Sequence, residues 1–142
     1  MLKVVFDTNI IVSGLIAHSG NPYKVLEAWR QGDVVLLVSK PIVDEVVSVL
    51  QRPFFREKRQ IGKADVVRIR RALETDTVMV SPQVHLKVVA NDPADDKILE
   101  CALEGGADYL VSGDHHLLEL KRYRHVRIAT ARQFLAILES QR

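Results

Sequence analysis

Residues 92–114 read "DPADDKILECALEGGADYLVSGD", and this stretch contains one helix and one strand with clear boundaries. Asp92 has the residue type that caps a helix, Pro93 suits the first helical position, and Gly105-Gly106 ends the helix. The apolar run 109–111 follows at once as a short strand. A helix that leads directly into an apolar strand is a building unit of α/β folds.

The same alternation extends through the rest of the chain. Predicted strands cover 3–6, 34–38, 78–80, 109–111 and 126–129. Further helices are predicted from Asn21 (as N-cap) to Gly32, from Ser39 and Pro41 to residue 50, over 63–75, and after a capping box of Thr130 and Gln133. The run "VVLLV" (34–38) is too uniformly apolar to have a wet face. The pattern predicts a three-layer α/β fold with a mostly parallel sheet.

The composition fits a single folded domain spanning residues 1–142. Apolar residues make up 47% of the chain and charged residues 27%, which excludes a disordered protein. There is no apolar run of about 20 residues and no signal-peptide pattern, so we expect a cytoplasmic protein without a membrane partner. The single cysteine, Cys101, excludes an internal disulfide and a cysteine-based zinc site, and its apolar neighbours predict a core position.

Charge is distributed unevenly along the chain, although the net formal charge is only +2. Residues 52–71 hold eight basic residues against two acidic ones, a net of +6, whereas residues 92–104 hold five acids against one lysine. A cationic band beside an acidic cluster suggests a polyanion-binding surface next to a carboxylate-rich site. On charge alone, solvated helix faces are the simpler interpretation of both segments.

Two aspartates follow predicted strands. Asp7 comes after the strand 3–6, within "KVVFDTNII" (3–11), and Asp114 comes after the strand 109–111. If these strands are parallel neighbours, both carboxylates emerge at the carboxyl edge of the sheet, where α/β proteins bind ligands. Each aspartate taken alone is also a common turn or cap residue.

Helix phase directs three further acids toward that edge. Glu45 borders the buried stripe through Ile42 and Val49, whereas Asp44 lies on the wet side of the same helix. Asp95 neighbours core-facing residues at i+3 and i+4, while Asp96 lies about 100 degrees around the helix. Four converging carboxylates repel one another, and the pKa of at least one of them rises unless a cation intervenes. Oxygen ligands without a Cys or His cluster favour Mg²⁺ or Mn²⁺, one or two ions.

Several stretches together resemble a known family over roughly residues 2–138. They are "VFDTNIIVSGL", "PIVDEVVSVLQRP", "NDPADDKILECALEGGADYLVSGD" and the terminal strand and helix. They resemble the PIN-domain ribonucleases, and especially the VapC-like toxins of toxin–antitoxin pairs. The resemblance implies a five-stranded sheet in the order 3-2-1-4-5. It also implies metal-dependent endonucleolytic cleavage of RNA that leaves a 5′-phosphate and a 3′-hydroxyl.

The resemblance also implies roles for individual residues. The catalytic and metal-binding acids correspond to Asp7, Glu45, Asp95 and Asp114, with Asp96 as the competing third ligand. Thr8, Asn9 and Ser112 match the small polar positions that support the acids through hydrogen bonds. Within the cationic band, the residues predicted to contact the RNA backbone are Arg52, Arg56, Lys58, Arg59 and Lys63.

The resemblance also implies partners, and the residues weigh against competing functions. We expect an RNA substrate, a cognate antitoxin chain, and a homodimer or higher homo-oligomer. Asn9 stands where a haloacid-dehalogenase-like phosphatase needs its second acid, and no glycine-rich loop follows the first strand as in a dinucleotide-binding protein. The alternative in a different class is a catalytically inactive PIN-like module that binds RNA or protein.

Overall fold

The computed structural model describes residues 1–87 and 93–141. The elements follow one another as β1 (Lys3–Phe6), α1 (Thr8–Ile16), α2 (Asn21–Arg30), β2 (Val35–Ser39), α3 (Lys40–Leu50), α4 (Pro53–Lys58), α5 (Lys63–Thr75), β3 (Val78–Val80), α6 (Pro93–Glu104), β4 (Tyr109–Val111), α7 (His115–Leu120), β5 (Arg122–Tyr123), β6 (Val126–Ala129) and α8 (Ala131–Ser140). The α/β alternation predicted from the sequence is therefore confirmed.

The strands form one six-stranded sheet in the order β3-β2-β1-β4-β6-β5. All pairs are parallel except β5 with β6. The expected order 3-2-1-4-5 is correct for the five parallel strands. The predicted count of five is one short, because the chain turns at Arg124 (φ 53°) and adds the two-residue antiparallel strand β5 at the edge.

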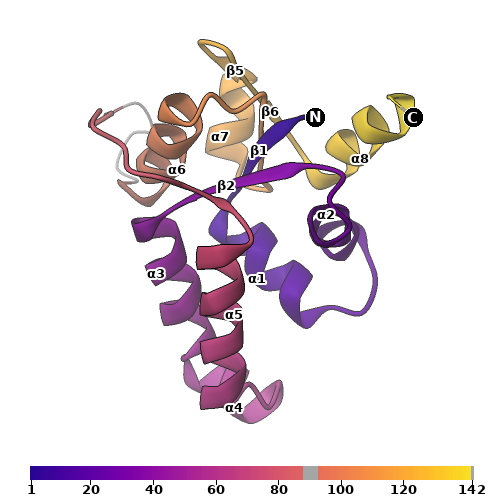
Figure 1. Ribbon diagram of the computed structural model, residues 1–142, viewed down its shortest axis with the longest axis vertical. Coiled ribbons are helices and arrows are strands. Elements are labelled where there is room, and N and C mark those ends of the chain that lie inside the picture. The colour runs from indigo at the N-terminus through magenta and orange to yellow at the C-terminus, as the bar shows by residue number, and fades with distance from the viewer. Residues whose placement is uncertain (88–92, 142) are drawn as a thin grey trace.

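Helices cover both faces of the sheet (Figure 1). The connections from β1 to β2 and from β2 to β3 run in one direction across the sheet and carry α1, α2, α3 and α5. The connection from β3 to β4 runs back and carries α6, which packs on β1 and β2. Because crossovers between parallel strands are right-handed, reversing the direction places α6 and α7 on the opposite face. The predicted three-layer architecture follows.

Strands β1 and β2 in the sheet interior are buried, as their uniform apolar runs predicted. Val4, Val5 and Phe6 of β1 are fully buried, and Leu36 and Leu37 of β2 are 1% exposed. Cys101 of α6 is also fully buried, which confirms its predicted core position. The residues that follow the carboxyl ends of these strands are therefore positioned by a packed core.

The helix ends are mostly where the sequence placed them. Thr130 and Gln133 form the expected capping box, since each side chain accepts the other residue's backbone N–H. The prediction of Asn21 as N-cap is wrong by one residue. Gly20 takes that position with φ 95°, a conformation that glycine adopts without a Cβ clash. The predicted cap Asp92 lies outside the described residues.

Candidate functional site

Asp7 lies at the junction between β1 and α1. Its carboxylate is 4% exposed and accepts the backbone N–H of Ile10 at 2.9 Å, which makes it the N-cap of α1. Its own N–H donates to the carbonyl of Val111 on the neighbouring strand β4 at 3.0 Å. The residue that the sequence placed at the end of the first strand is thus held at the carboxyl edge of the sheet.

Ser112 connects Asp7 to Asp114. Phe6 of β1 pairs with Val111 of β4, so the residues that follow them, Asp7 and Ser112, leave the sheet side by side. The Ser112 hydroxyl donates to Oδ2 of Asp7 and accepts the backbone N–H of Asp114 at 2.9 Å. Ser112 is fully buried, so these two bonds fix its hydroxyl between the two acidic positions.

Asp114 is in turn held at the start of α7. Its Oδ1 accepts the backbone N–H of His116 at 2.8 Å, and its side chain is half-buried. The neighbouring residues His115 and His116 are both exposed on the surface. The two aspartates predicted from strand ends are therefore brought into one hydrogen-bonded arrangement.

The pKa of Asp7 is raised above its ordinary value, chiefly because burial removes the charged form from water. The hydrogen bonds from Ser112 and from the N–H groups of Ile10 and Asn9 oppose that effect, and the negative charge of Asp114 adds to it. Protein donors therefore only partly offset the cost of ionising this buried carboxylate. A divalent ion is the kind of group that would stabilise it.

Asp95 and Asp96 both lie in the first turn of α6 and are 8% and 7% exposed. Helix phase predicted that Asp95 points inward more than Asp96 does. Burial does not separate them, because the first turn of α6 is covered around both side chains. Asp95 therefore stays the predicted third metal ligand, with Asp96 as the competing residue.

Glu45 is half-buried on α3, between the buried residues Ile42 and Val49, as helix phase predicted. Its neighbour Asp44 is oriented differently. The Asp44 carboxylate contacts Nζ of Lys40 at 3.7 Å and the guanidinium of Arg70 on α5 at 3.2 Å. The two adjacent acids of α3 thus differ in environment, and only Asp44 is engaged with α5.

Thr8 and Asn9, the other predicted supports, differ in exposure. Thr8 is 5% exposed, and its hydroxyl oxygen has no hydrogen-bond partner within residues 1–87 and 93–141. The Asn9 side chain is exposed, and this residue supports Asp7 through its backbone N–H. Buried hydroxyls are normally satisfied, so Thr8 offers an unused oxygen next to the Asp7 position.

The predicted acids do not form a closed ligand set. Within the described part of the chain, no group of three or more His, Cys, Asp or Glu side chains is arranged to hold a metal ion. Asp7 and Asp114 are linked through Ser112, whereas Glu45 lies on α3 and Asp95 and Asp96 lie on α6.

The cationic band forms the far end of the α3–α4–α5 unit, with α4 at the end of the unit away from the sheet (Figure 1). The five residues predicted to bind RNA are all exposed. Arg68 and Arg70, by contrast, are paired with Asp65 and Asp44. With 11 residues in α3, this basic tip stands about 16 Å from the carboxyl edge of the sheet, at 1.5 Å per residue.

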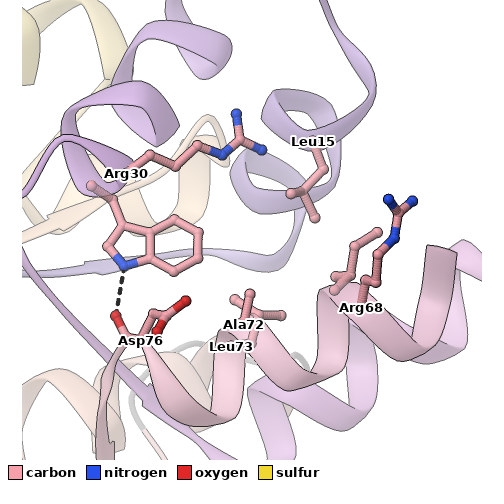
Figure 2. A pocket seen from close by; sticks show the side chains of 8 residues that line it. Leu15, Arg30, Arg68, Ala72, Leu73 and Asp76 are labelled. Atoms are coloured by element: carbon pink, nitrogen blue, oxygen red, sulfur yellow. Dashed lines mark hydrogen bonds between the residues drawn. The ribbon is translucent and has the colours of Figure 1, made fainter.

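A cavity of about 420 Å³ lies elsewhere, between α1, α2 and α5 (Figure 2). Leu15, Trp29 and Ala72 contribute to its walls, and the Trp29 indole N–H donates to the carbonyl of Asp76 at 2.9 Å. Its two arginines, Arg30 and Arg68, are each paired with an acid of their own helix. None of the predicted catalytic acids lines it, so it is not the candidate site.

Ser39 also lies at the carboxyl edge of the sheet. The sequence analysis assigned this residue only to the start of a helix. Val4 pairs with Leu36, so Ser39 at the end of β2 stands level with Asp7, and it is 1% exposed. The row at the carboxyl edge is therefore Ser39, Asp7 and Ser112. The signal was present in the sequence, because Ser39 ends the apolar run "VVLLV" just as Asp7 ends "KVVF".

The model of the PIN domain family matches residues 3–116, and the chain belongs to this family. PIN domains are generally nucleases. The chain is also 27% identical over 147 residues to the uncharacterized protein MJ1680 of Methanocaldococcus jannaschii, covering 97% of this chain and 92% of that protein.

The fold is similar to a chain in the crystal structure of VapBC2 from Rickettsia felis bound to a DNA fragment from their promoter. The TM-score is 0.56 with 14% sequence identity, over 89% of this chain and 97% of that one. At this identity the likeness shows a common fold. No helix within residues 1–87 and 93–141 is long and apolar enough to cross a membrane.

Proposed function

We propose that this protein is a divalent-metal-dependent ribonuclease, an endonuclease that hydrolyses RNA phosphodiester bonds with residues 1–142 as one nuclease domain. The observation that carries the proposal is the buried Asp7 carboxylate at the end of β1, joined through Ser112 to the segment of Asp114. Membership of the PIN domain family supports a nuclease, and the acids at the sheet edge support the metal.

The donor set fits a hard divalent cation. Asp7, Glu45, Asp95 and Asp114, with Asp96 as the competing third acid, would hold Mg²⁺ or Mn²⁺ through oxygen atoms alone. Burial raises the pKa of Asp7, so its carboxylate gains from a nearby cation, and the unpartnered Thr8 hydroxyl adds an oxygen within the described residues. When bound, such an ion activates water and neutralises charge on the departing 3′-oxygen.

The chain's own groups orient the acids for hydrolysis. Ser112 and the N–H of Ile10 hold one oxygen each of the Asp7 carboxylate, and the N–H of His116 holds Asp114. These bonds favour the ionised form and fix its direction. In the proposed reaction the oxygen of a water bonds to phosphorus and the bond to the 3′-oxygen breaks, which yields a 5′-phosphate and a 3′-hydroxyl.

The direct test uses purified protein and fluorescein-labelled single-stranded RNA with Mn²⁺, Mg²⁺ or EDTA. We expect cleavage with either ion, none with EDTA, and at least about a 100-fold loss of kcat/KM in Asp7→Asn, Glu45→Gln and Asp95→Asn. Asp44→Asn is the matched control for Glu45→Gln, since it removes an adjacent acid of α3 that contacts Arg70. Cleavage that survives chelation, or persists in Asp7→Asn, contradicts the metal site.

A second measurement reports on the metal without relying on activity. Because a ligand that binds only the folded state stabilises it, Mn²⁺ should raise the Tm of the wild-type protein in a concentration-dependent way. The Asp7→Asn variant should lose this response, and Asp44→Asn should keep it. RNA binding with neither cleavage nor a Mn²⁺ response would favour the inactive RNA-binding module.

We further propose that the protein is the toxin of a toxin–antitoxin pair, with a separate antitoxin chain as partner. The resemblance to VapC-like toxins and the fold shared with a chain of the VapBC2 complex support this proposal. Expression should arrest growth, and co-expression of the neighbouring gene product should relieve the arrest. Growth arrest by the Asp7→Asn variant would argue that toxicity does not depend on the acids.

A further inference from the structure

A second cavity, of about 290 Å³, opens at the carboxyl ends of β2 and β3. Ser39 and Lys40 line it from the junction of β2 and α3, Val80 from the end of β3, and His85 from the segment that follows. Lys97 and Glu100 of α6 complete the wall. In Figure 1, α6, the start of α3 and the segment after β3 lie on the same side of the molecule. Ligands of parallel α/β sheets gather at this edge.

The charged side chains of the cavity come from separate segments and are mainly cationic. Lys40 is 85% exposed, and its contact with Asp44 is long, at 3.7 Å. Lys97 contacts the buried Glu100 carboxylate at 3.6 Å. That carboxylate also accepts the N–H of Leu86 at 2.8 Å, so part of its negative charge is stabilised by the backbone. Two lysines against one engaged glutamate make the cavity suited to an anion, and the His85 imidazole adds a hydrogen-bonding group.

Hydrogen bonds to α6 hold the outer wall of the cavity in place. Glu104 accepts the backbone N–H groups of Gln83 and Val84 at 3.3 and 3.2 Å, and Glu100 accepts that of Leu86. The segment that carries His85 is thus tied to the helix that carries Lys97. The backbone of this wall of the cavity therefore has a preformed arrangement, which lowers the entropy lost on binding.

The cavity is adjacent to the acids in the sheet. Ser39 at its base stands level with Asp7 on the neighbouring strand. An RNA strand whose scissile phosphate lies over Asp7 also has phosphates one or two nucleotides away, and the acids repel them. A cationic cavity on the next two strands would offset that repulsion. The Ser39 hydroxyl is hydrogen-bonded to the Cys101 thiol and does not cap α3, so the positive end of this helix adds to the field.

We propose that this cavity is a subsite for one backbone phosphodiester of the RNA substrate, next to the bond that is cleaved, with Lys40 and Lys97 as its phosphate-binding residues. This proposal rests on the proposed ribonuclease function, and it also predicts in which direction the substrate strand crosses the sheet edge. The substrate strand runs from the acids at β1 toward β2 and β3. Lys40 and Lys97 position the strand and take no part in the chemistry.

The first test compares Lys40→Gln/Lys97→Gln with the charge-matched control Lys24→Gln/Arg132→Gln on α2 and α8. We expect KM for single-stranded RNA to rise at least about tenfold in the first variant, with kcat within about twofold. The slope of log affinity against log salt should fall by about 1.4, since each lost contact on a single strand removes about 0.7. Lys97→Arg should retain wild-type KM, which separates charge from folding.

The second test locates the phosphate on the substrate. A single neutral methylphosphonate is moved along the RNA one position at a time. In the wild type, one position beside the cleavage site should raise KM, and in Lys40→Gln/Lys97→Gln the same substitution should add nothing. A flat scan in the wild type overturns the subsite. So does saturable binding of inorganic phosphate that depends on Lys40 and Lys97 but leaves the scan flat, because the cavity would then serve free phosphate.

A binding arm separates the failure of the subsite from the failure of the ribonuclease. Fluorescence anisotropy with the same RNA is measured in EDTA, in the Asp7→Asn background. If wild type cleaves RNA while KM and the salt slope of Lys40→Gln/Lys97→Gln equal those of the control, the subsite is wrong and the nuclease stands. If wild type does not cleave but the lysine variant alone loses affinity, the phosphate site stands and the nuclease is wrong.

Discussion

Asp7 combines burial with ionisation, and the balance between them determines how the folded state responds to pH. Burial raises the pKa of this carboxyl in the folded protein, so the folded state holds the proton more tightly than the unfolded chain does. As pH rises from the ordinary value of 3.8 through the folded pKa, the folded state loses stability relative to a variant without the carboxyl. Below that window both states are protonated, and the difference vanishes.

The first prediction concerns the Asp7→Asn variant in EDTA. The Tm of this variant minus that of wild type should increase as pH is raised from about 3.5 to 7, because only the wild type must ionise a buried carboxyl. Thermal unfolding followed by circular dichroism measures both proteins. Asp44→Asn, which removes a half-exposed carboxylate, controls for the loss of one negative charge. A Tm difference that stays constant or shrinks over this range contradicts the prediction.

Cys101 gives the second prediction at the scale of one residue. Burial raises the pKa of its thiol to about 12, and a hydrogen bond from Ser39 only partly opposes this. The thiolate is the reactive form, so the folded protein should resist iodoacetamide at about pH 8 and should be labelled once unfolded in urea. Mass spectrometry counts the added groups. Fast labelling of the folded protein would place Cys101 in an opened, accessible environment.

At the scale of the element, α1 and α2 approach each other closely at Gly14. A Cβ added there would lie 2.6 Å from Cγ of Leu26 and 2.6 Å from the carbonyl oxygen of Pro22. Alanine favours a helix over glycine by about 0.5–1 kcal/mol, which alone would stabilise α1. The contact with a backbone oxygen opposes this gain, because the backbone of α2 cannot move aside as a side chain does.

The third prediction is therefore that Gly14→Ala destabilises the protein. Overpacking of this kind typically costs about 1–3 kcal/mol, more than the gain in helix propensity. Urea unfolding measures the change in free energy. Gly113→Ala is the control, since a Cβ there meets nothing within 4 Å. A variant of Gly14 as stable as wild type would mean that α1 and α2 can move apart at no cost.

Elements with a clear period and clear ends could be predicted from the sequence. The strands at 3–6, 78–80, 109–111 and 126–129 have the predicted bounds, as does α5. The sequence analysis did not predict α1, because "TNIIVSGLI" is apolar on most sides and rich in β-branched residues, a pattern that does not separate helix from strand. Tertiary contacts with α2 and α3 decide its helical state.

The sequence also predicted part of the candidate site. Strand ends identified Asp7 and Asp114, and helix phase placed Glu45 beside a buried stripe. The hydrogen bonds through Ser112 need the register of β1 against β4, which no local pattern contains. The equal burial of Asp95 and Asp96 likewise depends on what covers the first turn of α6. The sequence predicted that Asp7 and Asp114 leave neighbouring strands at one edge, whereas the individual hydrogen bonds and the burial of each acid required the three-dimensional structure.

At the scale of the whole molecule, charge is separated along the α3–α4–α5 unit. The acids lie at the sheet, and the exposed basic residues lie at the far end, about 16 Å away along α3. Phe54 is 53% exposed at this tip, with the Arg59 guanidinium 5.9 Å from its ring centroid. A polyanion attracted to the tip would reach the lysine cavity at the opposite end of α3, where Ser39 stands level with Asp7.

The last prediction tests whether the basic tip captures RNA through its charge. Arg56→Gln/Lys58→Gln/Arg59→Gln/Lys63→Gln removes four exposed cations, all from α4, its C-terminal flank and the start of α5. RNA affinity should fall, and the slope of log affinity against log salt should fall by up to about 2.8, at about 0.7 per phosphate contact on a single strand. Anisotropy titrations at several salt concentrations measure both.

The control for the tip replaces four exposed cations on other elements: Lys24→Gln/Lys121→Gln/Arg124→Gln/Arg132→Gln. Net charge is then equal in the two variants, so any difference between them comes from the position of the charge. Screening at about 0.15 M salt limits exposed charges to a range of about 8 Å, and remote cations should therefore contribute little. Equal losses of affinity in the two variants would mean that net charge alone attracts the RNA. A loss confined to the tip would place the approaching strand along α4 and α5, on the way to Glu45 and Asp7.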